Sequence, residues 1–221
     1  MLGRRITTIV THDILYNPDP YTRVELCGIF RDEDVATVNE LRPDLCGFVV
    51  NYPSSHRHVD RDRLRELVGK LDPTIPAVGI FVDQPLGYVS ELADEVLDVV
   101  QLHGNEGNPY ITFLRELVDI PIVQAIRMAG PEDVERANQS KADLVVLYGG
   151  WQAGVAFDWE LAGGVCRPYI LAGALTSQNL GGAIGRLAPW GVALNTGIET
   201  DRLNDPAKMA AAVAAARGAS K

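Results

Sequence analysis

Residues 78–82 read Val-Gly-Ile-Phe-Val, a short apolar run in which polar and apolar side chains do not alternate. Residues 144–147, Leu-Val-Val-Leu, have the same character. A parallel strand that helices cover on one face and a core covers on the other is continuously apolar in this way. These runs therefore predict buried strands of a parallel sheet.

Eight such runs recur along the chain, and each step leaves room for one strand, one helix and two loops. Their approximate centres are Leu26, Phe48, Ile80, Gln101, Gln124, Val146, Leu171 and Ala193. Helical patterns lie between them, at residues 32–40, 61–70, 85–96, 110–117, 131–137, 179–187 and 205–216, with the weakest pattern between the sixth and seventh runs. Asp205 and Pro206 suit the N-cap and first residue of the last helix.

Eight strand–helix repeats predict an α/β fold, a closed (β/α)8 TIM barrel over residues 24–221 with an N-terminal extension at 1–23. A doubly wound open sheet is the alternative. That fold favours a glycine-rich turn after its first strand, and no G-x-G-x-x-G follows the first run here.

Composition narrows the function classes. The chain has 221 residues, 20 basic against 29 acidic, and a net charge of −9, which argues against nucleic acid as a partner. The three cysteines, Cys27, Cys46 and Cys166, are odd in number and do not have zinc-site spacing, so a reducing cytoplasm is expected and no metal site. No apolar run approaches the ~18 residues of a membrane helix. We expect a monomer or homodimer.

The ends of the predicted strands are mostly polar or glycine, and barrel enzymes carry their chemistry there. In order they are Cys27, Asn51, Asp83, His103, Arg127, Tyr148, Gly173 and Thr196-Gly197. The backbone N–H groups of Gly173-Ala174 and Thr196-Gly197 follow the seventh and eighth strands, the usual place for a barrel phosphate site. Ordinary loop turns are the alternative for these two segments.

Several of these segments carry a family resemblance. Val24-Glu25-Leu26-Cys27-Gly28-Ile29, Val78 to Pro85 and, most specifically, Val100-Gln101-Leu102-His103-Gly104-Asn105-Glu106 resemble strand motifs of the phosphoribosylanthranilate isomerase family. The segments Gln124–Arg127, Phe157-Asp158-Trp159, Ile170–Gly173 and Gly197-Ile198-Glu199 follow in family order. The ordered set covers roughly residues 23–216.

The resemblance implies an Amadori rearrangement in the tryptophan branch or in related specialised metabolism. A phosphoribosylamine opens to an imine, loses its C2 proton and becomes a 1-deoxyribulose phosphate, with no metal or organic cofactor. Cys27 matches the family's general base, and a cationic or dipolar site would lower its pKa. The ligand is then a small phosphorylated sugar or aromatic compound, with Arg57, Asp83, His103 and Arg127 as candidate contacts and Arg57 on a carboxylate.

Three departures from the family pattern point to altered chemistry. Tyr148 stands where the family has its acidic aspartate, so it is either a weak phenolic acid or a pocket wall, with Asp83 or His103 as substitutes. Ala193 replaces a second aspartate, and the sixth loop carries Val155 at a lysine-like position. Trp151 in the same loop either stacks on an aromatic or sugar face or caps a hydrophobic edge. We therefore predict weak turnover. The alternatives are a relative that binds a phosphorylated or aromatic ligand with different chemistry, and a non-catalytic barrel acting through protein contacts.

Overall fold

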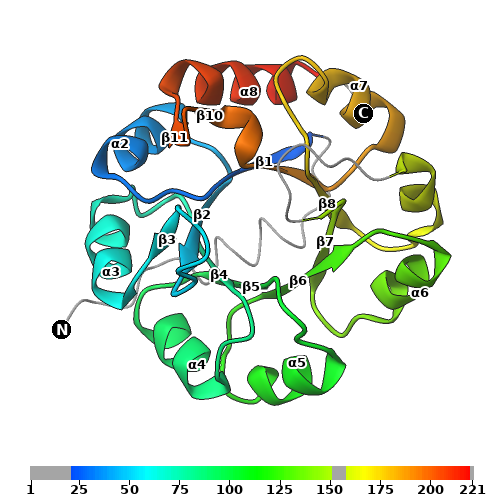
Figure 1. The fold of residues 1–221 in the computed structure, drawn as a ribbon, viewed down its shortest axis with the longest axis horizontal. Coiled ribbons are helices and arrows are strands. Elements are labelled where there is room, and N and C mark those ends of the chain that lie inside the picture. Colours follow the sequence, from blue (N-terminus) through cyan, green and yellow to red (C-terminus); the bar gives the residue numbers. More distant parts are fainter. Residues whose placement is uncertain (1–20, 151–157, 220–221) are drawn as a thin grey trace.

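The computed structural model describes residues 21–150 and 158–219, and its core is a ring of eight parallel strands. The strands are β1 (Arg23–Cys27), β2 (Leu45–Val50), β4 (Ala77–Phe81), β5 (Val99–Leu102), β6 (Ile122–Arg127), β7 (Leu144–Tyr148), β8 (Tyr169–Ala172) and β9 (Gly191–Leu194). β1 pairs with both β2 and β9, so the ring closes (Figure 1). The predicted TIM barrel is confirmed, and the open-sheet alternative is wrong.

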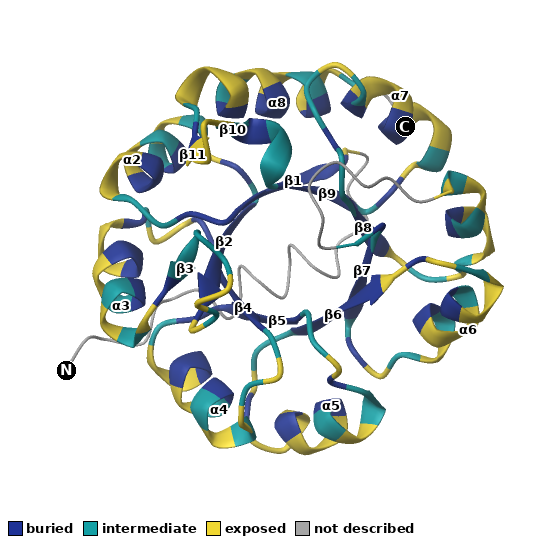
Figure 2. Ribbon diagram, in the orientation of Figure 1, coloured by how far each residue is buried: buried dark blue, intermediate teal, exposed yellow. Residues whose placement is uncertain are grey.

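Helices surround the ring and turn their buried faces toward it (Figure 2). They are α2 (Asp32–Leu41), α3 (Arg61–Lys70), α4 (Leu86–Glu95), α5 (Asn108–Arg115), α6 (Pro131–Gln139), α7 (Leu180–Leu187) and α8 (Pro206–Gly218). The weakest predicted helix is the 3-10 helix η1 (Trp159–Gly164). Asp205 caps α8 as expected, because its side chain accepts hydrogen bonds from the N–H groups of Ala207 and Lys208.

Short elements at the carboxyl ends of the strands were not expected from the apolar runs. β3 (His58–Val59) pairs with the end of β2. After β9, the 3-10 helix η2 (Thr196–Ile198) leads into a hairpin of β10 (Glu199–Thr200) and β11 (Leu203–Asn204). These elements place polar side chains above the open end of the barrel.

The barrel interior is filled by side chains that alternate along each strand with those that face the helices. The inner cluster contains Cys27, Leu45, Val49, Val78, Ile80, Val99, Val123, Ala125, Leu144, Val146, Ile170 and Ala193. Because Cys27 faces inward, the period of two also turns Glu25 and Arg23 toward the interior, and both are buried. The inward face of β1 therefore carries two charged side chains, Glu25 and Arg23, besides Cys27.

The predicted extension at 1–23 falls almost wholly outside the described residues, as do Trp151 and Val155 of the sixth loop. Within the described ranges, no helix combines the length and apolar character that crossing a membrane requires. The same ranges contain no cluster of three or more His, Cys, Asp or Glu side chains suited to a metal ion.

Candidate active site

A cavity of about 690 Å³ opens at the carboxyl ends of the strands. Cys27 from β1, His103 after β5 and Tyr148 from β7 all line it, as expected for three residues that end barrel strands. Other predicted site residues on its wall are Arg57, Gly173, Ala174 and Thr196. The structure thus brings most of the predicted site residues to one place.

Cys27 is a buried thiol at the floor of this cavity. The Nδ2 amide of Asn195 donates to its Sγ at 3.6 Å. Burial raises the pKa of the Cys27 thiol strongly, and the nearby Glu25 carboxylate raises it further, while Arg57 and Asn195 lower it by less. The expectation of a lowered pKa is therefore corrected: burial keeps the Cys27 thiol protonated at neutral pH.

His103 and Tyr148 form an aromatic wall with ring centres 5.8 Å apart. Burial lowers the pKa of His103 to about 4, so the imidazole is neutral at pH 7. Its Nε2 lies 2.7 Å from the Nε2 of Gln101, which fits an amide donating to the neutral ring. Burial also raises the pKa of the Tyr148 phenol, against an opposing effect of Arg127 and Arg136, so Tyr148 is a weaker acid than a free phenol.

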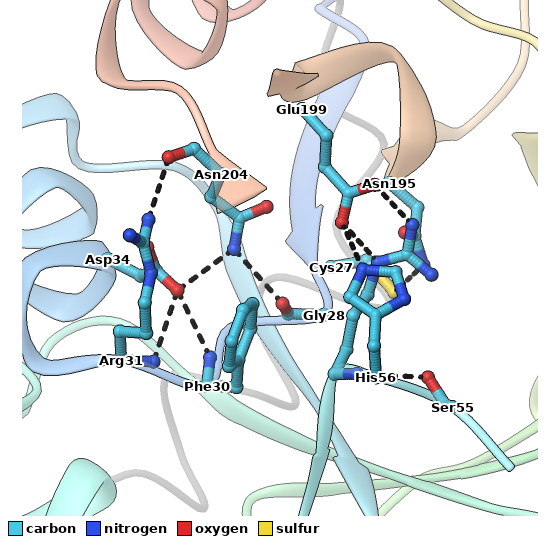
Figure 3. A network of polar contacts seen from close by, with 11 residues as sticks. Cys27, Gly28, Phe30, Arg31, Asp34, Ser55, His56, Asn195, Glu199 and Asn204 are labelled. Atoms are coloured by element: carbon cyan, nitrogen blue, oxygen red, sulfur yellow. Dashed lines mark hydrogen bonds and ion pairs between the residues drawn. The ribbon is translucent and has the colours of Figure 1, made fainter. Parts of the chain in front are cut away.

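Arg57 lies in the loop between β2 and β3 and forms a bidentate ion pair with Glu199 of β10. Its Nε and Nη2 donate to the two carboxylate oxygens at 2.6 and 2.5 Å. His56 Nε2 also lies 3.0 Å from Glu199 Oε1 (Figure 3). Gly28 makes room for this arm, since a Cβ at Gly28 would lie 2.5 Å from Arg57 Cδ, and its φ of +79° favours glycine. The sequence motif Gly197-Ile198-Glu199 gave no sign of this role for Glu199.

A second network holds the loop that follows Cys27 (Figure 3). The buried carboxylate of Asp34 accepts hydrogen bonds from the backbone N–H groups of Phe30 and Arg31 and from Asn204 Nδ2 at 3.0 Å. Asn204 Nδ2 also donates to the carbonyl oxygen of Gly28 at 3.1 Å. The hairpin after β9 is thereby fastened to the turn beside the thiol.

Asp83 and Arg127, two of the predicted contacts, are not on the cavity wall. Asp83 accepts hydrogen bonds from the N–H and Nδ2 of Asn105 at 2.6 and 3.0 Å. Glu106 in turn accepts from the N–H of Asp83 at 2.6 Å. The segment after His103 therefore ties the β4 and β5 loops together. Arg127 is exposed at the end of β6.

The predicted phosphate-binding turns lie next to each other. Gly173 and Ala174 adopt φ angles of +89° and +52°. A Cβ at Gly197 would lie 1.8 Å from the carbonyl oxygen of Leu175, so only glycine permits the two turns to approach so closely. In the described part of the chain, the N–H groups of Gly173, Ala174, Thr196 and Gly197 donate to no backbone acceptor. Four donors are thus available to an anion, although Gly197 itself is not on the cavity wall.

Comparison with known proteins identifies a family. The sequence model described as N-(5'phosphoribosyl)anthranilate (PRA) isomerase matches residues 24–215. An Acetivibrio thermocellus protein named N-(5'-phosphoribosyl)anthranilate isomerase is 37% identical over 205 residues, which cover 85% of this chain and 92% of that protein.

Solved structures give the same answer. The phosphoribosyl anthranilate isomerase of Thermus thermophilus superposes with a TM-score of 0.78 at 30% identity, covering 88% of this chain and 98% of that chain. A second such isomerase, in complex with reduced 1-(o-carboxyphenylamino)-1-deoxyribulose 5-phosphate, superposes with a TM-score of 0.77 at 28% identity, covering 89% and 99%.

Proposed function

Because the chain belongs to the phosphoribosylanthranilate isomerase family, and its function is that of a phosphoribosylanthranilate isomerase of tryptophan biosynthesis, we propose that the rearrangement takes place in the cavity beside Cys27. One observation carries this placement. The same cavity has a thiol at its floor and, on its wall, the turns of Gly173-Ala174 and Thr196 with their available N–H donors. A phosphorylated sugar that rearranges in this way needs N–H donors for its phosphate and a base for its C2 proton.

The substrate phosphate binds to the N–H groups of Gly173, Ala174, Thr196 and Gly197. Backbone donors suit a phosphate because they are fixed in place and need no side-chain ordering. Arg57 receives the carboxylate of the aromatic ring. Glu199 occupies Nε and one Nη of Arg57, so the second Nη edge remains for the substrate, and Glu199 and His56 act as positioning residues.

The chemistry then needs two proton transfers. Protonation of the furanose ring oxygen breaks the bond between that oxygen and C1, and the nitrogen lone pair forms the C1=N imine. Cys27 as thiolate takes the proton from C2, and the electron pair of that C–H bond forms the enolamine, which tautomerises to the 1-deoxyketose. Tyr148 stands where the family's acid stands and donates the first proton. Its raised pKa makes this the slow step.

The test is the rate at which anthranilate fluorescence disappears when the purified protein meets phosphoribosylanthranilate. We expect slow turnover, a drop of ~10²–10⁴-fold for Cys27→Ala, and a smaller drop for Tyr148→Phe. Cys166→Ala is the matched control, because Cys166 is exposed and away from the cavity. Full activity of Cys27→Ala would contradict the assignment of the base. No turnover with retained phosphate binding would favour the alternative, a phosphorylated ligand with different chemistry.

The proposal extends to the setting of the enzyme. All three cysteines are free thiols, which supports a reducing cytoplasm. Residues 1–23 are proposed as an extension of the barrel domain, and a monomer or homodimer as the working form.

A further inference from the structure

Glu25 is a buried carboxyl group directly beneath Cys27. It lies two residues earlier on β1, and the residue is 1% exposed. A Cβ on Gly47 of β2 would lie 2.8 Å from Glu25 Oε1 and 3.3 Å from the Cα of Cys27. The carboxyl group of Glu25 and the backbone of Cys27 therefore both face Gly47 on the barrel wall.

No described residue forms a hydrogen bond or an ion pair with this carboxyl group. Both of its oxygens are buried without a hydrogen-bond partner. The neighbouring strands present Gly47 and, in register with Glu25, Ala193. The guanidinium of Arg23, the next inward residue on β1, lies over the Trp190 ring at 4.6 Å and forms no ion pair with Glu25. Burial alone raises the pKa of Glu25 to about 7.

The charges that face Cys27 come from three directions. Glu25 lies below it, Arg57 reaches it from the loop before β3, and Glu199 acts from β10, with the amide of Asn195 against the sulfur. Loss of the thiol proton to water beside an ionised Glu25 would put two negative charges into one apolar enclosure. Transfer of that proton to Glu25 keeps a single charge there.

We propose that Glu25 is the proton acceptor of Cys27 and that the two residues share one proton. Neither oxygen of Glu25 is hydrogen-bonded to Sγ in this structure, so the carboxyl group turns toward the sulfur when the proton is shared. The S–H bond of Cys27 breaks and an O–H bond forms on Glu25, which leaves a thiolate above a neutral carboxylic acid. When the thiolate has taken the C2 proton of the substrate, Cys27 passes that proton to water in the cavity and takes the proton of Glu25 in its place. One proton leaves in total, and the pair returns to a thiol above an ionised carboxylate. Glu25 is not on the cavity wall, so it acts on the substrate only through Cys27.

This inference rests on the proposed role of Cys27, but it has a consequence that needs no substrate. The thiolate beside a neutral Glu25 is a fixed fraction of all Cys27–Glu25 pairs that have lost one proton. The amount of thiolate therefore increases with pH up to about 7, where the pair loses its first proton. Above that pH it stays constant until the pair loses its second proton at a much higher pH. We propose to follow the alkylation of Cys27 by iodoacetamide from pH 5 to 10, with mass spectrometry at each cysteine. Cys166 is exposed and serves as an internal control in the same sample.

In the native protein we expect the alkylation rate of Cys27 to break near pH 7 and then to level off. Glu25→Gln should remove the break, so that the rate rises through pH 7 and at pH 9 exceeds the native rate by ~10–100-fold, a tenfold rise for each pH unit. Cys166 should behave identically in both proteins. A native profile without a break, or the same break in Glu25→Gln, overturns the proposal. Glu25→Met replaces Glu25→Gln if the latter does not fold.

The isomerase reaction gives an independent readout. The break near pH 7 should appear in kcat/KM of the native enzyme and vanish in Glu25→Gln, with KM unchanged because Glu25 does not line the cavity. If the Cys27→Ala variant keeps its isomerase activity while the native protein shows the alkylation break, the role of Cys27 as base is wrong and the shared proton stands. If Cys27→Ala is inactive and the native protein shows no break, Cys27 is the base and the shared proton is wrong.

Discussion

Replacing Glu25 by glutamine should stabilise the barrel at alkaline pH. In the folded protein, burial raises the pKa of Glu25 from 4.5 to about 7, which means that the fold disfavours the ionised form. Between these two values the unfolded chain is ionised and the folded chain is protonated, so the folded state binds more protons. The free energy of unfolding therefore falls as pH rises from about 4.5 to 7 and levels off above 7.

The size of this effect follows from the shift. One pKa unit corresponds to about 1.4 kcal/mol, so the full penalty at pH 8 is roughly 3 kcal/mol, whereas less than about 1 kcal/mol has developed by pH 5. A glutamine has nearly the shape of glutamate but does not ionise. Any fixed cost of burying its amide is the same at both pH values, so it cancels when the two are compared.

Urea unfolding followed by circular dichroism at pH 5 and pH 8 measures the difference. We expect Glu25→Gln to gain roughly 2–3 kcal/mol relative to the native protein between pH 5 and pH 8. The exposed Glu116 provides the matched variant Glu116→Gln, which should show no such gain. Equal stability changes of Glu25→Gln at the two pH values would refute the claim that this carboxyl group is buried and uncompensated.

Three further perturbations test the site. His103→Gln should remove a stability loss of roughly 3 kcal/mol that the native protein suffers between pH 6.5 and 4, because the lowered pKa of His103 lets only the unfolded chain take up a proton there; acid unfolding curves measure this loss. Gly28→Ala should raise KM about tenfold or more, since its Cβ would displace Arg57 and its φ is +79°; an unchanged KM would remove Arg57 from the binding model. Gly197→Ala should weaken inhibition by inorganic phosphate and lower thermal stability by about 1–3 kcal/mol, because its Cβ would lie 1.8 Å from the Leu175 carbonyl oxygen; undiminished phosphate affinity would argue against that turn as the phosphate site.

The strands could be predicted from the sequence because parallel barrel strands are buried on both faces and are read as apolar runs. Every predicted centre falls within an observed strand, and the helices differ from their predicted ranges only at the ends. The hairpin at 199–204 could not be predicted in this way. Its strands have two residues each, and their place depends on Asn204, whose amide bonds to Asp34 and Gly28 far away in the chain.

The candidate site was predictable where the end of a strand alone decides the direction of a side chain. This held for the presence of Cys27, His103 and Tyr148 on the cavity wall. It did not hold for Asp83, whose orientation depends on hydrogen bonds with Asn105 and Glu106 across two loops. A pairing between distant loops leaves no local pattern in the sequence.

The inward direction of Glu25 can be predicted from the sequence, although Glu25 is not among the expected site residues. In the run Val24-Glu25-Leu26-Cys27, the period of two that turns Cys27 inward also turns Glu25 inward. A charged residue at an inward position of a barrel strand contradicts the apolar pattern, and such a contradiction points to a functional position rather than a packing position.

Glu25 and Ala193, which stands where the family pattern has an aspartate, face the same part of the barrel interior. The two positions are in register on β1 and β9, so their side chains share one small region of the wall. An aspartate at 193, as in the family pattern, would place a second carboxylate beside an uncompensated one, and two like charges at that distance oppose each other's ionisation. The methyl group of Ala193 avoids this repulsion and leaves Glu25 as the carboxyl group next to the thiol. The interior of β1 thus retains an acid–base partner for Cys27, although it approaches the thiol from below the cavity and not from its wall.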